Sequence, residues 1–162
     1  MDVFLYDAVR TPRGKAKADG GLAKLSPQEL VRQQALALAA RCGDVAANPD
    51  ALLIGCVTQA GAQGAHIGLV AKLHAGLPDR TTAHTINNYC ASGLTAIGQA
   101  AAMIARGQAE VVFAGGVESM SRTPFMSDRA AYYSDISLPP RALCAAGAGR
   151  RPTCPCRGDW PG

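Results

Sequence analysis

The stretch Thr85–Leu94, which reads TINNYCASGL, joins an extended run of β-branched residues to the start of a helix. Residues 81–89 are predicted to form a strand and residues 91–106 a helix. Cys90 then lies at the carboxyl end of the strand and at the first turn of the helix. Free N–H groups and the positive end of the helix dipole favour a thiolate there, and the same N–H groups can receive an oxyanion. The position predicts a nucleophilic cysteine, although on position alone an inert buried cysteine fits equally well.

Three other apolar runs predict further strands. Residues 3–9 and 111–114 are short, and residues 51–57 form a continuous apolar run that is typical of a strand buried on both faces. Gly115–Gly116 ends the run 111–114 and favours a tight strand exit over a phosphate-binding loop. Its spacing matches neither a dinucleotide fingerprint nor a P-loop.

Helices alternate with these strands. Ser26 is predicted to cap the first helix, with Pro27 at its first position, Glu29 completing a capping box and Gly43 ending it. Two further helices are predicted from apolar stripes, the second of which ends at Gly107. The stripes consist of Ile67, Val70, Ala71 and His74, and of Leu94, Ile97, Ala101 and Ile104.

This alternation predicts an α/β fold, a mostly parallel sheet with helices on both faces. Ligands of such sheets bind beyond the carboxyl ends of the strands. Cys90 follows a predicted strand directly, so the sequence places it where this architecture carries its chemistry.

Composition excludes several classes of function. The chain has 162 residues, 48% hydrophobic and 17% charged, which is an ordinary globular balance for one domain with a core. Residues 141–162 contain four Arg and one Asp and so contribute +3 of the net charge of +4. The rest of the chain is nearly neutral and lacks the basic stripe that nucleic-acid binding needs. No apolar run reaches the roughly 18 residues of a membrane span. Asp2 and Asp7 flank the first run, unlike a signal peptide. We expect a cytoplasmic protein with reduced thiols and neither a membrane nor a nucleic-acid partner.

Four segments together resemble the thiolases. Residues 87–94 (NNYCASGL) look like the nucleophile segment of that family, residues 7–12 (DAVRTP) like its opening strand and turn, and residues 115–121 (GGVESMS) like its glycine-glycine-x-glutamate-serine-methionine motif. The passage Arg122–Leu143 looks like the start of the loop domain of degradative-type thiolases. The resemblance covers roughly residues 1–140.

The resemblance implies acyl transfer on coenzyme A thioesters, either cleavage of a 3-ketoacyl-CoA by CoA or the reverse condensation of acetyl-CoA. Cys90 would be the residue that is acylated, and its own backbone N–H would help to form the oxyanion hole. Acyl-CoA and CoA would be the substrates, with no permanently bound cofactor and no metal, and the family forms homodimers or tetramers. Residues 1–121 would be an incomplete N-terminal half-domain of a thiolase-like α/β fold, and residues 122–140 the start of a loop domain.

The chain departs from the family in what it lacks. In thiolases the histidine that activates the nucleophile, a second cysteine and an asparagine come from a second half-domain. None of His66, His74 and His84 stands in the position of that base; His84 is interpreted as a structural residue of its strand, and the other two as partly exposed. We therefore expect this fragment to be inactive by itself, and to leave acetyl-CoA unreacted. The alternatives are a non-catalytic remnant or interaction partner, and a ketoacyl synthase, against which the Asn-Asn-Tyr-Cys and Glu-Ser-Met context argues.

The last 22 residues, 141–162, differ from the rest in composition. They contain no Ile, Val, Phe, Tyr or Met, but four Arg, four Gly, three Pro and three Cys. This change predicts an aberrant, disordered tail, and we interpret it as translation in a shifted frame. Its three cysteines, Cys144, Cys154 and Cys156, lack the spacing of a zinc site.

Several other residues have two readings. Glu118 is either a general acid or base near the active centre or a buried structural carboxylate that accepts backbone N–H groups. Arg10 and Arg13 either contact an acidic ligand, such as a CoA phosphate, or hold the loop after the first strand. Cys42 and Cys56 are interpreted as small core residues.

Overall fold

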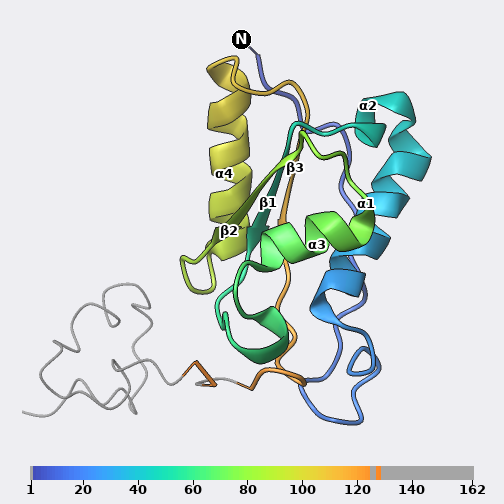
Figure 1. Ribbon diagram of the computed structural model, residues 1–162, viewed down its shortest axis with the longest axis vertical. Helices are drawn as coiled ribbons and strands as arrows, with labels where there is room; N and C mark the ends of the chain where they lie inside the picture. The colour runs from blue at the N-terminus through green and yellow to red at the C-terminus, as the bar shows by residue number, and fades with distance from the viewer. Residues whose placement is uncertain (1, 125–126, 129–162) are drawn as a thin grey trace, which may run out of the picture. The chain divides into compact units, whose positions relative to one another are not determined.

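The computed structural model describes residues 2–124 and 127–128, with three strands at its centre (Figure 1). Strand β1 (Ala51–Gly55) lies between β2 (Thr82–Ile86) and β3 (Val112–Gly116). Both neighbours run parallel to β1, whose residues are all buried. The predicted parallel sheet with a buried central strand is therefore confirmed.

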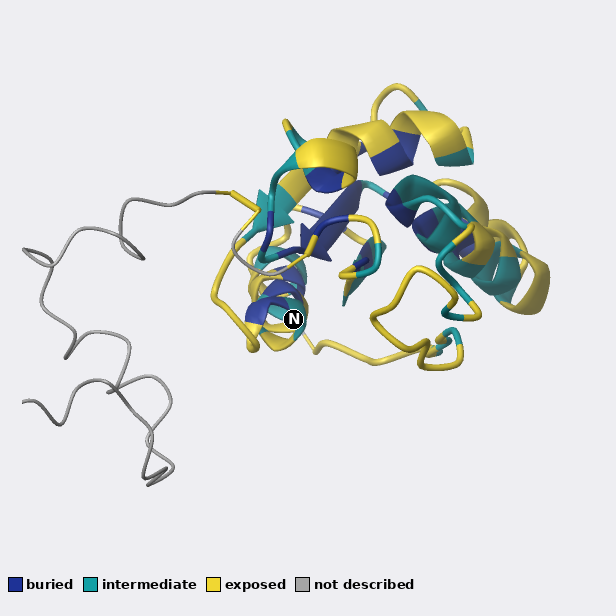
Figure 2. Ribbon diagram, turned by 90° about the horizontal axis from the view of Figure 1, so that it is seen from below, coloured by how far each residue is buried: buried dark blue, intermediate teal, exposed yellow. Residues whose placement is uncertain are grey.

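Helices cover both faces of the sheet, as predicted. Helices α1 (Pro27–Cys42) and α3 (Ile67–Ala75) lie on one face, and α4 (Ser92–Ala105) is the one described helix on the other (Figure 1). Buried residues are concentrated on β1 and on the helix faces turned toward the sheet, and others lie in the loops next to the strands (Figure 2). The sequence did not predict the short helices α2 (Asp44–Ala47) and η1 (Gly61–Gln63).

The ends of α1 follow from its sequence. The Oγ atom of Ser26 accepts a hydrogen bond from the N–H of Glu29 at 3.3 Å, and Gly43 ends the helix with a φ of +60°. In a capping box the carboxylate of Glu29 would accept from the N–H of Ser26, but here it has other partners. It binds Arg32 at 3.0 Å and His74 at 2.7 Å, so it joins α1 to α3.

The predicted first strand, residues 3–9, is wrong. A strand needs a ladder of hydrogen bonds to a neighbouring strand. These residues have no such partner within the described part of the chain. Three of its side chains, Phe4, Leu5 and Tyr6, are 78%, 82% and 73% exposed. The segment is instead tied to α1, because a carboxylate oxygen of Asp7 lies 2.7 Å from Nε of Arg41.

Helix α4 turns a different face to the sheet from the one predicted. Leu94 and Ile97, which belong to the predicted core stripe, are 73% and 47% exposed. The helix buries Ser92, Ala96 and Ala100 instead. Small side chains face the sheet because the helix lies very close to it, and the large apolar side chains are left on the outer face.

The predicted stripe of α3 is also only partly right. Ile67 and Ala71 are buried, whereas Val70 and His74 are exposed. The other buried residues of this helix are Gly68 and Lys72. A Cβ atom on Gly68 would lie 2.5 Å from the carbonyl oxygen of His84, so this face of α3 touches the backbone of β2.

Glycines at the carboxyl ends of β1 and β3 allow close backbone contacts, that of β1 with α4 and that of β3 with β1. A Cβ atom on Gly55 would lie 2.5 Å from the carbonyl carbon of Ser92 and 2.6 Å from the nitrogen of Gly93. A Cβ atom on Gly116 would lie 3.1 Å from the carbonyl oxygen of Gly55. Gly116 is the last residue of β3 and not an exit after it, but the expected steric reason for a glycine holds at this position.

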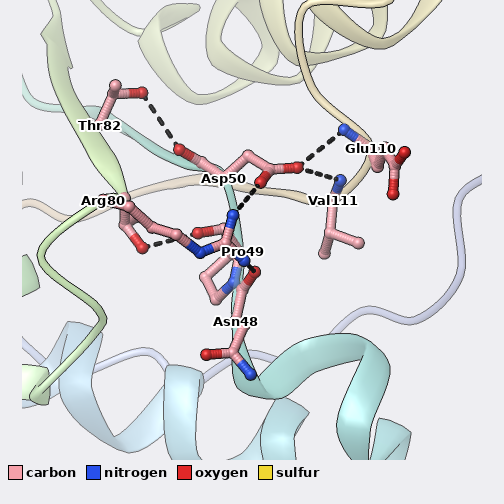
Figure 3. Close-up of polar contacts among 8 residues, drawn as sticks. Asn48, Pro49, Asp50, Arg80, Thr82, Glu110 and Val111 are labelled. Atoms are coloured by element: carbon pink, nitrogen blue, oxygen red, sulfur yellow. Dashed lines mark hydrogen bonds and ion pairs between the residues drawn. The ribbon is translucent and has the colours of Figure 1, made fainter.

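Asp50 joins the amino ends of all three strands (Figure 3). Its carboxylate accepts hydrogen bonds from the N–H groups of Glu110 and Val111 at 2.8 and 3.1 Å, and from Arg80 at 2.7 Å. Arg80 also donates to the carbonyl oxygen of Asn48 at 2.8 Å. The two backbone N–H groups are the main cause that holds the pKa of Asp50 below its ordinary value.

Some predictions concern residues that lie outside the described part of the chain. These are the tail 141–162 with Cys144, Cys154 and Cys156, and most of the predicted loop-domain start 122–140. Among the described residues, no helix is long and apolar enough to cross a membrane.

We predict opposite effects from two glycine substitutions. Gly55→Ala should lower the free energy of unfolding by about 1–3 kcal/mol, because the added methyl group meets the backbone of α4. Gly98→Ala, within α4, should raise the free energy of unfolding by about 0.5–1 kcal/mol, because a Cβ atom there meets nothing within 4 Å. Urea unfolding of the two variants measures both values, and equal effects would contradict the close packing of α4 on β1.

We predict that Asp50→Asn lowers the free energy of unfolding at pH 7 by about 1–2 kcal/mol, because a charged acceptor of two N–H groups is lost. The pKa of Asp50 is lowered by folding, so this stabilisation is fully present above the ordinary value of 3.8 and declines as the pH falls through the lower, folded value. The difference in the free energy of unfolding between the parent and Asp50→Asn should therefore shrink as the pH is lowered below 3.8. Asp79→Asn is the control, and a difference that persists at low pH would contradict the assignment.

Candidate active site

Cys90 lies in the turn between β2 and α4. Strand β2 ends at Ile86 and α4 begins at Ser92, with Ala91 as its N-cap residue. The prediction that Cys90 follows the carboxyl end of its strand is confirmed, whereas its placement in the first helical turn is wrong, because it precedes the N-cap. The Cys90 side chain is exposed, so the alternative of an inert buried cysteine is also wrong.

The turn has an uncommon backbone conformation. Tyr89 has a φ of +48°, in the left-handed region that bulky residues rarely adopt. Its N–H donates to Oδ1 of Asn87 at 3.0 Å, and its carbonyl oxygen accepts from the hydroxyl of Ser92 at 2.6 Å. The same hydroxyl oxygen accepts from the N–H of Asn88 at 2.8 Å. Side chains on both sides of Cys90 therefore fix the residue before it.

The backbone N–H of Cys90 remains available in this arrangement. The N–H of Ala91 donates to the carbonyl oxygen of Asn88 at 3.1 Å, and the N–H of Ser92 to that of Tyr89 at 3.0 Å. The N–H of Cys90 is not paired with any acceptor among residues 2–124 and 127–128. An unpaired N–H beside a thiol is the kind of donor that an oxyanion requires.

Glu118 connects the loops that follow β1 and β3. Its carboxylate accepts hydrogen bonds from the N–H groups of Val57 and Thr58 at 2.8 and 3.3 Å, and from Nε2 of Gln63 at 2.8 Å. The reading of Glu118 as a structural acceptor of backbone N–H groups is confirmed. The expectation that it is buried is wrong, because the residue is exposed.

Gln63 is the buried centre of this network, and the sequence analysis missed it. Its amide nitrogen also donates to the carbonyl oxygen of Thr58 at 2.8 Å, and its amide oxygen accepts from the N–H of Ser119. The side chain is completely buried. Its partners lie up to 56 positions away in the sequence, so no local pattern could have indicated them.

The three described thiols have different environments. Cys56 is buried, and burial, followed by the neighbouring Glu118, raises the pKa of its thiol to about 12. Burial also raises the pKa of Cys42, with the charge of Asp7 as a second cause. Both residues belong to the core or pack against it, as expected. Cys90 is the one exposed cysteine among the described residues.

The three histidines have roles elsewhere in the fold. Nδ1 of His66 accepts from the N–H of Leu69 at 3.0 Å and caps α3, and Nε2 of His74 lies 2.7 Å from the carboxylate of Glu29. His84 lies on β2 in a surface depression lined also by α4. Within the described part of the chain, none of them is hydrogen-bonded to Cys90, and no cluster of His, Cys, Asp or Glu is arranged to hold a metal ion.

The alternative in which Arg10 or Arg13 holds a loop is not supported among the described residues, where another arginine has that role. Arg10 donates only to the carbonyl oxygen of the adjacent Thr11, at 3.3 Å, among the described residues. Arg122 instead binds three consecutive carbonyl groups, those of residues 23–25, at 2.7–3.1 Å. Contact of Arg10 or Arg13 with an acidic ligand stays a prediction.

The family described as "Thiolase, N-terminal domain" matches residues 3–141. The β-ketoadipyl-CoA thiolase of Pseudomonas knackmussii is 42% identical over 130 residues, and the 3-ketoacyl-CoA thiolase of Bacillus subtilis is 39% identical over 125 residues. These matches cover 80% and 77% of this chain and 32% of each relative. The chain thus spans about a third of the length of these relatives.

Two solved structures are similar in fold. The acetyl-CoA acetyltransferase of Bacillus anthracis has a TM-score of 0.59 and 38% identity, over 65% of this chain and 26% of that one. The human mitochondrial 3-ketoacyl-CoA thiolase, solved in complex with CoA, has a TM-score of 0.59 and 31% identity, over 67% and 27%. Both match the described α/β arrangement.

We predict that iodoacetamide labels Cys90 long before Cys42 or Cys56. Cys90 is exposed, whereas burial raises the thiol pKa of the other two and leaves little thiolate at pH 8. The measurement is peptide mass spectrometry in a background in which Cys144, Cys154 and Cys156 are replaced by Ser. Early labelling of Cys56 would contradict the described packing.

Proposed function

Because the chain belongs to the thiolase family, we propose that it carries the acyl-accepting cysteine of an acyl-CoA C-acyltransferase, and that this cysteine is Cys90. One observation carries the proposal. The thiol of Cys90 is exposed beyond the carboxyl end of β2, next to its own N–H, which has no acceptor within residues 2–124 and 127–128. A nucleophile and an oxyanion donor are the two groups that acyl transfer requires first.

The proposed step is a thioester exchange. The Cys90 thiol loses its proton to a base, and the sulfur attacks the carbonyl carbon of an acyl-CoA. The N–H of Cys90 donates to the oxyanion that forms. The bond between that carbon and the sulfur of CoA then breaks, and CoA leaves and takes up a proton as a free thiol. The product is an S-acyl group on Cys90, which a second thiol or an acetyl-CoA carbanion can receive.

The proposed substrates are CoA thioesters as a class. The similar proteins are named for β-ketoadipyl-CoA, 3-ketoacyl-CoA and acetyl-CoA, which differ in the acyl group and share the thioester of CoA. Use of CoA as a substrate, without a permanently bound cofactor, and assembly into homodimers or tetramers stay predictions.

The described residues supply the nucleophile without a base. His66 and His74 are bonded to other groups, and the chain spans about a third of its relatives. We therefore propose that this chain alone can form the acyl-cysteine only when alkaline solvent ionises the thiol, and that it does not turn over. The alternative, a non-catalytic remnant or interaction partner, is favoured by the exposed apolar side chains of Leu94 and Ile97.

The test is an incubation of the chain with acetyl-CoA, followed by intact and peptide mass spectrometry. At pH 7 we expect almost no acetylation, because no base removes the thiol proton. Near pH 9.5 we expect one acetyl group on Cys90, because hydroxide in the solvent can serve as the base that the described residues do not supply. Adding CoA should remove the acetyl group again, without the release of a condensation product.

Cys90→Ser is the control for the site, in the background that lacks Cys144, Cys154 and Cys156. Acetylation of Cys42 or Cys56 at the same rate would show unspecific chemistry. A folded chain with a free Cys90 thiol that stays unacetylated at pH 9.5 would support the non-catalytic alternative.

A further inference from the structure

We propose that Asn87 is a positioning residue for Cys90, and that it acts by clamping the turn of Tyr89 to the loop after β1, which Glu118 holds in place. The inference rests on the proposed function, because it concerns the orientation of the acyl-accepting thiol. It is carried by an unbroken series of hydrogen bonds from β3 to the residue before Cys90.

The series begins at Glu118, two residues after the end of β3. Its Oε2 accepts from the N–H of Val57 at 2.8 Å. The carbonyl oxygen of the same Val57 accepts from Nδ2 of Asn87 at 3.1 Å, and Oδ1 of Asn87 accepts from the N–H of Tyr89 at 3.0 Å. The single amide of Asn87 thus uses its donor on the loop after β1 and its acceptor on the turn that holds Cys90.

Tyr89 is the residue that needs this support. A tyrosine with a φ of +48° is held against its own steric preference, and such a conformation persists only when its surroundings fix it. Its N–H is fixed by Asn87 and its carbonyl oxygen by Ser92. If Asn87 is removed, Tyr89 can relax toward negative φ, which rotates the next peptide and with it the N–H of Cys90.

Glu118 makes the clamp rigid. Both of its carboxylate oxygens bind the loop after β1, through Val57, Thr58 and Gln63. The loop that receives the Asn87 amide is therefore fixed to β3 as well as to β1. The carboxylate acts at a distance from the thiol, through the Val57 peptide, and needs no proton transfer.

Two reactions of Cys90, alkylation and acylation, distinguish a positioning role of Asn87 from a merely structural one. Alkylation by iodoacetamide requires only an accessible thiolate, whereas acylation also requires the N–H of Cys90 to point at the developing oxyanion. Loss of positioning should therefore slow acetylation and spare alkylation. Loss of the fold would instead expose Cys56, whose labelling reports opening of the core.

The experiment compares Asn87→Ala with the parent chain near pH 9.5. We expect acetylation of Cys90 by acetyl-CoA to slow about tenfold, with alkylation of Cys90 changed by less than about twofold. Glu118→Gln should slow acetylation in the same direction by a smaller factor. Tyr89→Asn should restore most of the rate in the Asn87→Ala background, because asparagine tolerates a positive φ.

Asn48→Ala and Glu110→Gln are the matched controls, since both residues are exposed and remote from the turn, and both variants should behave as the parent chain. Equal slowing of acetylation and alkylation in Asn87→Ala, or no rescue by Tyr89→Asn, would overturn the inference.

Amide hydrogen exchange decides the inference independently of acyl transfer. The N–H groups of Ala91 and Ser92 donate to carbonyl groups of the turn and do not touch Asn87. In Asn87→Ala they should exchange about five- to tenfold faster, while the amides of β1 keep their protection. Unchanged exchange would overturn the inference. Absence of acetylation in every variant, the parent included, would overturn the proposed function and leave this measurement to decide the positioning.

Discussion

The amino end of α4 rests directly on backbone. At Gly55 a methyl group would lie 2.5 Å from the carbonyl carbon of Ser92, which no packing rearrangement short of moving the helix could relieve. This approach fixes where α4 begins relative to β1, and with it the turn that carries Cys90. The same closeness selects Ser92, Ala96 and Ala100 as the inward face, since larger side chains would push the helix away from the sheet. The start of α4 relative to the sheet is therefore set by a residue without a side chain, Gly55, and side-chain hydrogen bonds then fix the turn itself.

A consequence of this packing is the apolar outer face of α4. Leu94 and Ile97 are exposed, as are Phe4, Leu5 and Tyr6 near the amino terminus. Exposed apolar side chains in such numbers on a small chain favour association or aggregation. Because the chain spans about a third of its relatives, these surfaces are also where further structure in a longer protein could pack. The same arrangement thus provides a well-held site and a surface that a monomer leaves uncovered.

The sequence predicted those features that depend on neighbouring residues. Ser26, Pro27 and Gly43 gave the bounds of α1, and the continuous apolar run 51–57 gave the buried central strand. Features that depend on distant partners were missed. Residues 3–9 have strand-forming side chains but pair with neither edge of the described sheet, and the stripe of Leu94 and Ile97 is helical in period but faces outward. Asp50, Gln63 and Arg122 each have a side-chain bond to a residue 30–99 positions away, and periodicity contains no information about such bonds.

The candidate site was predicted in the same uneven way. Cys90 could be found because its motif lies within ten residues, but its distance from the helix start and the conformation of Tyr89 could not. Side chains of Asn87 and Ser92 fix Tyr89, the residue before Cys90, and Glu118 fixes the loop after β1, whereas the ring nitrogens of His66 and His74 are bonded to other groups. Positioning and activation are therefore separable here. A chain of this kind can orient the proposed acyl acceptor through its own hydrogen bonds, while no described histidine is bonded to the thiol that would have to lose its proton.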